Sequence, residues 1–322
     1  MPISNGTAVP AKTILVTGAG GFVGGHLLPA LRAAFPSARI LGTGQHAHAG
    51  LIALDITQRD AVTQLITAEK PDACIHLAGI SAIGAASANP DHAWEVNLHG
   101  SLNLADAIQA HAPHCRMIFI SSAECYGSSF KSSQKLDESA VLAPMNLYAA
   151  TKAAADLALG ARAGQGLRLL RLRPFNHTGP GQSEDFVVPA FAGQIARIEA
   201  GQVLPEISVG TLESARDFLD VRDVCAAYVQ CVAQDAGLPD HAILNIASGQ
   251  AIKIATILEM LLSRTKHSIT VRQDPARLRP AEIPTAIGDA TRAAQLLHWQ
   301  PQIPMAQTLD SVLDFARQKT RK

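Results

Sequence analysis

The sequence has no excess of charge of either sign. Its 322 residues contain 27 Lys and Arg against 27 Asp and Glu, so the formal net charge is zero. A protein that binds DNA or RNA needs a basic surplus to neutralise the phosphate backbone. We therefore expect no nucleic-acid partner.

Long hydrophobic runs are absent as well. No uninterrupted apolar stretch approaches the ~20 residues that a bilayer span requires. The opening residues, MPISNGTAVPAK, lack a charged segment followed by an apolar one. We therefore expect neither a signal peptide nor a membrane span, and we expect the protein in the cytoplasm.

Cysteine and histidine patterns typical of metal sites are also missing. The five cysteines include no CxxC pair, and no Cys/His cluster has the spacing of a zinc site. We expect no metal centre, and we expect reduced thiols packed as small hydrophobes. With 48% hydrophobic and 17% charged residues, the chain has the composition of a globular protein.

The first half of the chain alternates short apolar runs with longer helical segments. This alternation is typical of parallel strands joined by crossover helices. The runs are apolar throughout because helices cover both faces of such a sheet. We predict an α/β fold with a doubly wound parallel sheet of the Rossmann type. The expected strands are 12–17, 39–43, 73–77, 117–121 and 167–172, and the expected helices are 22–35, 59–68, 90–111 and 146–162.

The pattern changes after Pro174. We place one domain at 1–174 and a smaller C-terminal α/β domain at 175–322, and we expect the segments around 221–246 to return to the first domain. The expected elements of this half are helices at 187–201, 221–233, 252–262 and 304–318 and a strand at 242–246.

A glycine-rich loop follows the first expected strand. Gly18, Gly21 and Gly24 are spaced three apart and run directly into a helix, with Phe22 and Val23 between them. Glycines allow the backbone to turn tightly and to touch a pyrophosphate, and the helix N-terminus offers free N–H groups to the anion. A turn without a ligand is the alternative, but the strand before and the helix after favour a dinucleotide site.

The end of the second expected strand bears on which dinucleotide binds. Segment 42–46 contains no carboxylate to repel a 2′-phosphate and no Arg or Lys to attract one. The sequence therefore permits NADPH or NADH, with Thr43 and Gln45 as candidate ribose contacts. Asp55 is a candidate adenine contact, and its alternative role is to cap the next helix.

Two segments carry candidate catalytic groups. Tyr148 and Lys152 lie four residues apart on an expected helix and so share one face. We expect the lysine ammonium to lower the pKa of the phenol towards neutrality. Ser122 follows the fourth strand, at the carboxyl edge where ligands bind in open α/β sheets. Its hydroxyl and the Tyr–Lys pair can converge on one carbonyl oxygen.

These motifs together carry a family resemblance over nearly the whole chain. TGAGGFVGGHL, HLAG at 76–79, SSAECYG and YAATK occur in the order seen in extended short-chain dehydrogenase/reductases that act on nucleotide sugars. The segments 173–187, 209–224 and 277–289 resemble the branch of this family that reduces GDP-4-keto-6-deoxy-D-mannose in GDP-D-rhamnose synthesis.

The resemblance implies a role for each matching residue. Tyr148 would be the acid, Lys152 its electrostatic partner and a ribose contact, and Ser122 the second hydrogen bond to the sugar oxygen. Glu124 joins this catalytic group with an open role, as a contact to substrate hydroxyls or as a polar residue at the cleft mouth. Further implied cofactor contacts are Ile56, Leu77, Ala78 and Gly79, and implied substrate contacts are Asn176, Val187, Arg216, Arg279 and Glu282.

Arginine suits a diphosphate because its planar fork pairs with phosphate oxygens. For each arginine the alternative is a surface ion pair, for example of Arg216 with Asp217 or Asp220. Glu124 does not distinguish a reductase from the related dehydratases. Ala123 weakly favours a reductase, because some dehydratases have a functional Asp at this position and alanine cannot replace it.

The expected reaction is reduction of the C4 keto group of a GDP-4-keto-6-deoxy sugar by NADPH or NADH, giving GDP-D-rhamnose. One alternative is a nucleotide-sugar 4,6-dehydratase or 4-epimerase with tightly bound NAD. The other is a dinucleotide-sensing binding protein without catalysis. Family members pair through two helices, so the resemblance also implies a homodimer through helices 91–111 and 146–162.

Overall fold

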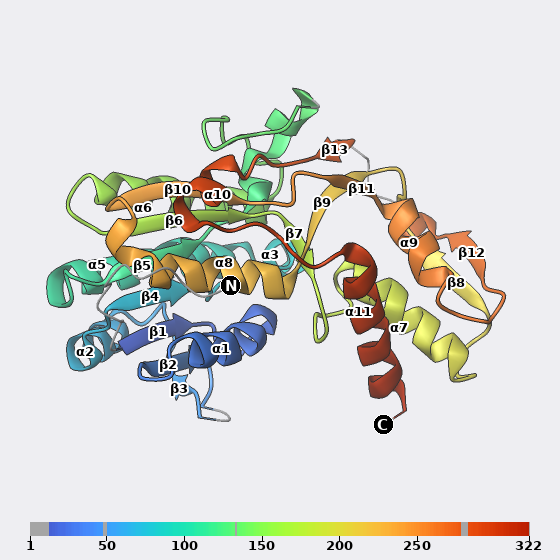
Figure 1. Ribbon diagram of the computed structural model, residues 1–322, viewed down its shortest axis with the longest axis horizontal. Helices are drawn as coiled ribbons and strands as arrows, with labels where there is room; N and C mark the ends of the chain where they lie inside the picture. The colour runs from blue at the N-terminus through green and yellow to red at the C-terminus, as the bar shows by residue number, and fades with distance from the viewer. Residues whose placement is uncertain (1–12, 48–49, 133, 278–282, 322) are drawn as a thin grey trace.

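A seven-stranded parallel sheet organises the larger part of the molecule (Figure 1). The computed structural model describes residues 13–47, 50–132, 134–277 and 283–321. The strand order is β10-β6-β5-β4-β1-β2-β3, and every neighbouring pair is parallel. The doubly wound sheet predicted from the sequence is confirmed. The strands are β1 Thr13–Thr17, β2 Arg39–Gly44, β3 Ile52–Ala53, β4 Ala73–His76, β5 Arg116–Ile120, β6 Leu169–Pro174 and β10 His241–Ile246.

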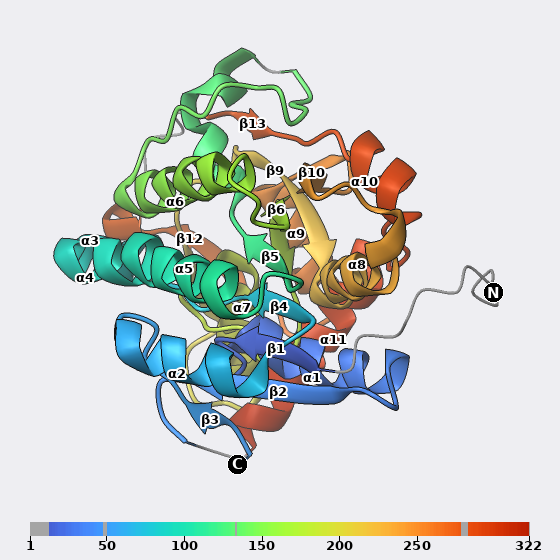
Figure 2. The ribbon, with the colours of Figure 1, turned by 90° about the vertical axis from the view of Figure 1, so that its left-hand side faces the viewer.

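Helices cover both faces of this sheet (Figure 2). Alternate residues of one strand face opposite layers, so Ile14 and Val16 of β1 join one apolar cluster and Leu15 joins the other. The helices of the first layer are α1 Phe22–Ala34, α8 Val221–Ala233 and α10 Thr291–Leu297, and those of the second are α2 Arg59–Glu69, α5 Ser101–His111 and α6 Leu147–Ala163.

The long helix expected at 90–111 is interrupted. The structure has α4 Pro90–Trp94, a π-helical turn at Glu95–Gly100 and then α5. The wide turn holds the buried Asn97, whose side chain bonds the backbone of Ile80 and donates to Thr151 Oγ1 at 2.9 Å. Such π-turns are frequent at functional sites. The short helix α3, Ile83–Ala88, was not predicted.

A third apolar cluster is built from the later part of the chain, and its helices lie beside the main sheet (Figure 1). Its helices are α7 Val187–Glu199, α9 Ile254–Leu262 and α11 Met305–Thr320. Short strands accompany them in two small sheets. These are β7 Asn176–Thr178, β9 Ala215–Asp220, β11 Ala251–Lys253 and β13 Thr285–Ala286 in one sheet, and β8 Glu206–Val209 with β12 Thr270–Gln273 in the other.

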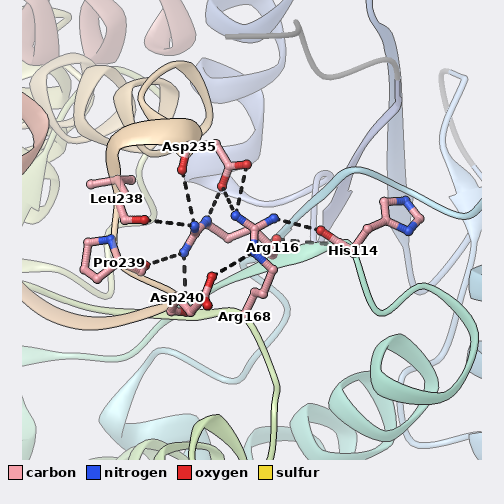
Figure 3. Close-up of polar contacts among 8 residues, drawn as sticks. His114, Arg116, Arg168, Asp235, Leu238, Pro239 and Asp240 are labelled. Atoms are coloured by element: carbon pink, nitrogen blue, oxygen red, sulfur yellow. Dashed lines mark hydrogen bonds and ion pairs between the residues drawn. The ribbon is translucent and has the colours of Figure 1, made fainter.

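At the amino edge of the main sheet, a cluster of charged side chains surrounds the buried Arg116 (Figure 3). Arg116, at the start of β5, is 1% exposed and donates to the Asp235 carboxylate and, at 2.8 Å, to the Pro239 carbonyl. Arg168 donates to Asp235 at 3.2 Å and to the His114 carbonyl at 2.9 Å. The cluster fastens the connection between α8 and β10 to the sheet, at the edge opposite the candidate site.

Candidate functional site

The glycine loop between β1 and α1 has no room for side chains. Gly18 has φ +67°, and a Cβ there would lie 2.6 Å from the backbone nitrogen of Ala78. A Cβ on Gly24 would lie 2.3 Å from the Ala19 carbonyl oxygen. Gly21 caps α1 without a side-chain hydrogen bond, so the helix N-terminus presents its backbone N–H groups to an anion. The loop therefore fits a dinucleotide pyrophosphate.

Residues at the end of β2 suit the adenosine end of a dinucleotide. Thr43 is 1% exposed, and its hydroxyl has no hydrogen-bond partner among the described residues. An unpaired buried hydroxyl is costly, so a ligand oxygen is a fitting partner. Gln45 and His46 follow on the exposed surface.

Asp55 does not cap α2, whose N-cap is Gln58 without a side-chain hydrogen bond, and instead closes the turn that precedes the helix. Its carboxylate accepts from the backbone N–H and the hydroxyl of Thr57, at 2.9 and 2.8 Å, just before α2 begins. The neighbouring Ile56 is buried, and its side chain fills the space beside Gly100.

A buried hydroxyl–imidazole–hydroxyl chain supports the segment after β4. Thr17 Oγ1 lies 2.6 Å from His76 Nδ1, and His76 Nε2 lies 2.9 Å from Ser101 Oγ. Burial, helped by the Lys152 charge, lowers the pKa of His76 to about 3. The Ala78 N–H donates to Thr17 at 3.3 Å, which fixes the segment 77–79 over the glycine loop. Sequence analysis missed this chain, although His76 stands in the HLAG motif.

Lys152 is almost fully buried beneath the site. Its ammonium donates to the Ile120 carbonyl and lies 4.5 Å from the centre of the Phe119 ring. Burial lowers the pKa of Lys152 to about 8. A Cβ on Gly79 would lie 3.9 Å from the Lys152 nitrogen, so a larger side chain there would crowd the ammonium.

The expected lowering of the Tyr148 pKa is wrong for this structure. Burial raises the pKa of Tyr148, and its hydrogen bond with Ser122 lowers the pKa by less. The Lys152 ammonium donates to the Ile120 carbonyl and is not among the groups that shift the Tyr148 pKa. Ser122 is nevertheless close enough to act on the Tyr148 pKa, and Ser122 Oγ accepts from the Glu124 N–H at 3.1 Å.

Glu124 faces both the catalytic helix and the later part of the chain. Its carboxylate accepts from the Asn146 amide at 3.4 Å, and Asn146 also caps α6 by accepting from Ala149 N–H at 2.8 Å. The Glu124 charge reaches Arg216 of β9, since it opposes the lowering of the Arg216 pKa that burial causes. The structure thus brings Arg216 to the catalytic edge. Sequence analysis missed Asn146, although an Asn before a helix is a capping pattern.

Arg216 does not form the ion pairs that were its alternative role. Asp217 is fully buried and accepts from Ser248, Gly249 and Gly288. Asp220 caps α8 and pairs with Arg222 at 2.7 Å.

The contacts of the Arg216 guanidinium are to backbone. It donates to the carbonyls of Ala215 and Ile283 at 2.9 and 3.0 Å. Within the described part of the chain it has no carboxylate at ion-pair distance. A half-buried guanidinium of this kind suits an incoming phosphate.

Of the remaining candidates, those in the described part of the chain make no side-chain hydrogen bond or ion pair with these groups. Asn176 begins β7 and is exposed, and Val187 begins α7. Arg279 and Glu282 lie outside the described residues. Across the described residues, no group of three His, Cys, Asp or Glu side chains could hold a metal ion, and no helix is long and apolar enough to cross a membrane.

Comparison with known proteins gives the same family throughout. A family model described as GDP-mannose 4,6 dehydratase matches residues 15–312. The chain is 36% identical over 313 residues to GDP-6-deoxy-D-mannose reductase of Pseudomonas aeruginosa, covering 97% of this chain and 99% of that protein.

Two solved structures are similar over nearly their whole length. The structure of RMD from Pseudomonas aeruginosa with NADPH has a TM-score of 0.84 and 34% identity, covering 96% of this chain and 98% of that one. A putative epimerase from Burkholderia cenocepacia has a TM-score of 0.84 and 30% identity, covering 97% and 100%.

Proposed function

This chain belongs to the GDP-mannose 4,6 dehydratase family, and from that premise we propose that it reduces the C4 keto group of a GDP-4-keto-6-deoxy sugar, giving GDP-D-rhamnose. The observation that carries the proposal is the chain of hydrogen bonds that places Ser122 beside the helix of Tyr148 at the carboxyl edge of the sheet. Ser122 Oγ accepts from the Glu124 N–H, and the Glu124 carboxylate accepts from Asn146, which caps that helix. The Pseudomonas aeruginosa relative, a GDP-6-deoxy-D-mannose reductase by name, supports the choice of sugar.

Tyr148 and Ser122 act on the sugar oxygen. A bound nicotinamide supplies the hydride that reduces the carbon. Tyr148 donates a proton to the developing alkoxide, and Ser122 donates a second hydrogen bond to the same oxygen. Lys152 places a positive charge behind the tyrosine. In a site that excludes water, these preorganised donors stabilise the charge more than they would in bulk solvent.

Residues of the later part of the chain hold the nucleotide diphosphate. Arg216 pairs with a phosphate, since its fork has donors left over after its two backbone contacts. Arg279 and Glu282 are proposed as further nucleotide contacts, and Asn176 and Val187 as contacts to the sugar and phosphates. Glu124 accepts from a sugar hydroxyl while Asn146 holds its other side.

The glycine loop and the end of β2 hold the cofactor. The N–H groups at Phe22 and Val23 bind the pyrophosphate, while the Gly21 N–H donates to the Gly18 carbonyl and closes the turn. Thr43 and Gln45 contact the adenosine ribose. The segment 77–79, together with Tyr148 and Lys152, lines the nicotinamide side. The NADPH in the similar Pseudomonas structure supports a nicotinamide cofactor here, and the chain uses NADPH or NADH.

The proposal includes the assembly and setting of the enzyme. Two domains meet near residue 174, the first binding the dinucleotide and the second the nucleotide sugar, and the segments around 221–246 return to the first. Support comes from β10, which pairs with β6 in the main sheet. The enzyme is a homodimer of the cytoplasm that pairs through α5 and α6, where Leu157 is 60% exposed.

A small panel of 4-keto nucleotide sugars, each assayed with NADPH and with NADH, tests the proposal. We expect consumption of the reduced cofactor with GDP-4-keto-6-deoxy-D-mannose and slower consumption with UDP- or dTDP-linked sugars. A purified protein that retains a dinucleotide absorbance and turns over without consuming cofactor is instead an epimerase or dehydratase. Tight cofactor binding without turnover of any sugar would indicate a sensing protein.

A further inference from the structure

Asp156 is the carboxylate of the catalytic helix α6 and lies two turns beyond Tyr148. Tyr148, Lys152 and Asp156 of α6 are spaced four residues apart and so follow one face of the helix. The Asp156 side chain is 0% exposed, which is rare for a carboxylate and is tolerated only with full pairing. The proposed reaction uses the first two residues and leaves Asp156 without a role.

Two arginines of β6 neutralise Asp156. Arg173, itself 3% exposed, donates to both carboxylate oxygens at 3.1 and 2.9 Å, and Arg171 donates to one of them at 3.0 Å. The nearby Ser121 hydroxyl also acts to lower the pKa of this carboxylate. These bonds hold the pKa of Asp156 below its usual range in spite of burial. The helix is thereby fastened to β6 and to the end of β5.

The network continues into the loop that bears Ser122. Arg173 also donates to the Tyr126 hydroxyl at 3.1 Å, and its guanidinium lies 5.1 Å from the centre of the Tyr126 ring. Tyr126 in turn donates to Asn245 of β10 at 2.8 Å. Asp156 is therefore linked to residues on both sides of Ser122. Before Ser122, the Ser121 hydroxyl acts on the Asp156 carboxylate, and after Ser122, Arg173 joins Asp156 to Tyr126.

We propose that Asp156 is a positioning residue for the proposed reaction: it holds the helix that carries Tyr148 and Lys152 in fixed register with the loop that carries Ser122. The inference rests on the proposed function for its kinetic consequences. A displacement of about 1 Å between such groups can cost a factor of about 100 in rate.

Asp156 also acts on the charge of Lys152. The groups that face the Lys152 ammonium are Cys125 from the loop after β5, His76 from β4 and Asp156 from its own helix, with the two arginines of β6 behind Asp156. Burial lowers the pKa of Lys152, and Asp156 opposes this. Removal of the carboxylate charge therefore lowers the Lys152 pKa further, so that the lysine loses its proton at a lower pH.

The amino edge of the sheet provides a control. There Asp235 pairs with Arg116, which is 1% exposed, and with Arg168 (Figure 3). Asp235→Asn takes a carboxylate from a buried arginine far from the catalytic groups, although the Asp235 side chain is 36% exposed and Asp156 is 0% exposed. The free energy of unfolding is therefore measured for both variants, and kcat is compared at a temperature at which both are fully folded.

The test compares Asp156→Asn, Arg173→Lys and Asp235→Asn with the wild type in kcat, in KM for the sugar, and in the Lys152 pKa measured by ¹⁵N NMR of its ammonium group. For Asp156→Asn we expect kcat to fall about 10- to 100-fold with KM little changed. We expect its Lys152 pKa to fall below that of the wild type.

For Arg173→Lys, which keeps the charge but loses the planar fork, we expect kcat to fall without a change in the Lys152 pKa. Asp235→Asn changes neither quantity. Equal losses of kcat in Asp156→Asn and Asp235→Asn, or wild-type kcat in Arg173→Lys, overturn the inference.

If Asp156→Asn does not fold, Arg173→Lys decides by its kcat alone. If the wild type reduces no GDP-4-keto sugar, the proposed function fails. The inference is then judged by the NMR titration, which needs no substrate, and an unchanged Lys152 pKa in Asp156→Asn overturns it.

Discussion

Substitution by alanine should change the stability of the protein in opposite directions at Gly18 of the cofactor loop and at Gly25 of helix α1. Gly18 has φ +67°, and a Cβ there meets the rigid backbone of Ala78 at 2.6 Å. Gly25 lies on the exposed side of α1, and a Cβ there has nothing within 4 Å. We predict that Gly18→Ala lowers the free energy of unfolding and that Gly25→Ala raises it.

The magnitudes follow from the geometry. A left-handed conformation costs an L-residue roughly 1–2 kcal/mol, and forcing a methyl group against fixed backbone costs about 1–3 kcal/mol more. Gly18→Ala should therefore lose about 2–5 kcal/mol. Gly25→Ala should gain about 0.5–1 kcal/mol, because alanine loses less entropy than glycine in a helix. Against a total stability of about 5–15 kcal/mol, this difference is large.

Urea unfolding followed by circular dichroism measures the difference, with the slope of the transition as a check that the unfolded state is unchanged. Fluorescence titration with NADPH is the second readout. Gly18→Ala should bind NADPH weakly, since the loop must open to admit the methyl group, whereas Gly25→Ala should bind as the wild type does. Equal stability and equal NADPH affinity in the two variants would refute the reasoning.

Three further predictions follow from the site and the surface. Tyr148→Phe keeps the ring but removes the proton, so kcat should fall by a factor of roughly 10²–10⁴ while the affinity for NADPH stays the same. A kcat within a few-fold of the wild-type value excludes Tyr148 from the mechanism. The ratio of kcat/KM for NADPH to kcat/KM for NADH should lie within about tenfold of unity in the wild type. Gln45→Asp should shift this ratio towards NADH, and Gln45→Arg should shift it towards NADPH. An unchanged ratio in both variants shows that residue 45 does not face the ribose. Light scattering at micromolar concentration should give the mass of a dimer for the wild type and of a monomer for Leu157→Glu, and a monomeric wild type contradicts the assembly.

The main sheet could be predicted because its strands are buried on both faces. Runs such as TILVT at 13–17 are apolar without alternation, and helices of ten or more residues separate them. The short strands of the later part gave no comparable pattern. β9 reads ARDFLD, in which the buried Asp217 is satisfied by Ser248, distant in sequence, and Asp220 by the distant Thr308 as well as by the neighbouring Arg222. The distant partners cannot be inferred from the strand itself.

The site could be predicted only as far as local spacing reaches. The separation of Tyr148 and Lys152 shows that they share a helix face, but not that the ammonium bonds the Ile120 carbonyl. Arg216 stays available for an anion because the Asp217 carboxylate accepts hydrogen bonds from Ser248 and Gly288 instead. These residues lie in loops some 30 and 70 residues further along the chain, so the sequence near Arg216 does not reveal them. The π-turn at 95–100 likewise depends on the tertiary partners of Asn97 rather than on its neighbours.

The most direct test of the proposed function uses NADPH that carries deuterium at the transferable position of the nicotinamide. The enzyme is given this cofactor and GDP-4-keto-6-deoxy-D-mannose, and the product is analysed by mass spectrometry and NMR. The account predicts one deuterium in each product molecule, bound at C4 of the sugar, with one NADPH consumed per sugar. A product without deuterium, or turnover without consumption of NADPH, would contradict it.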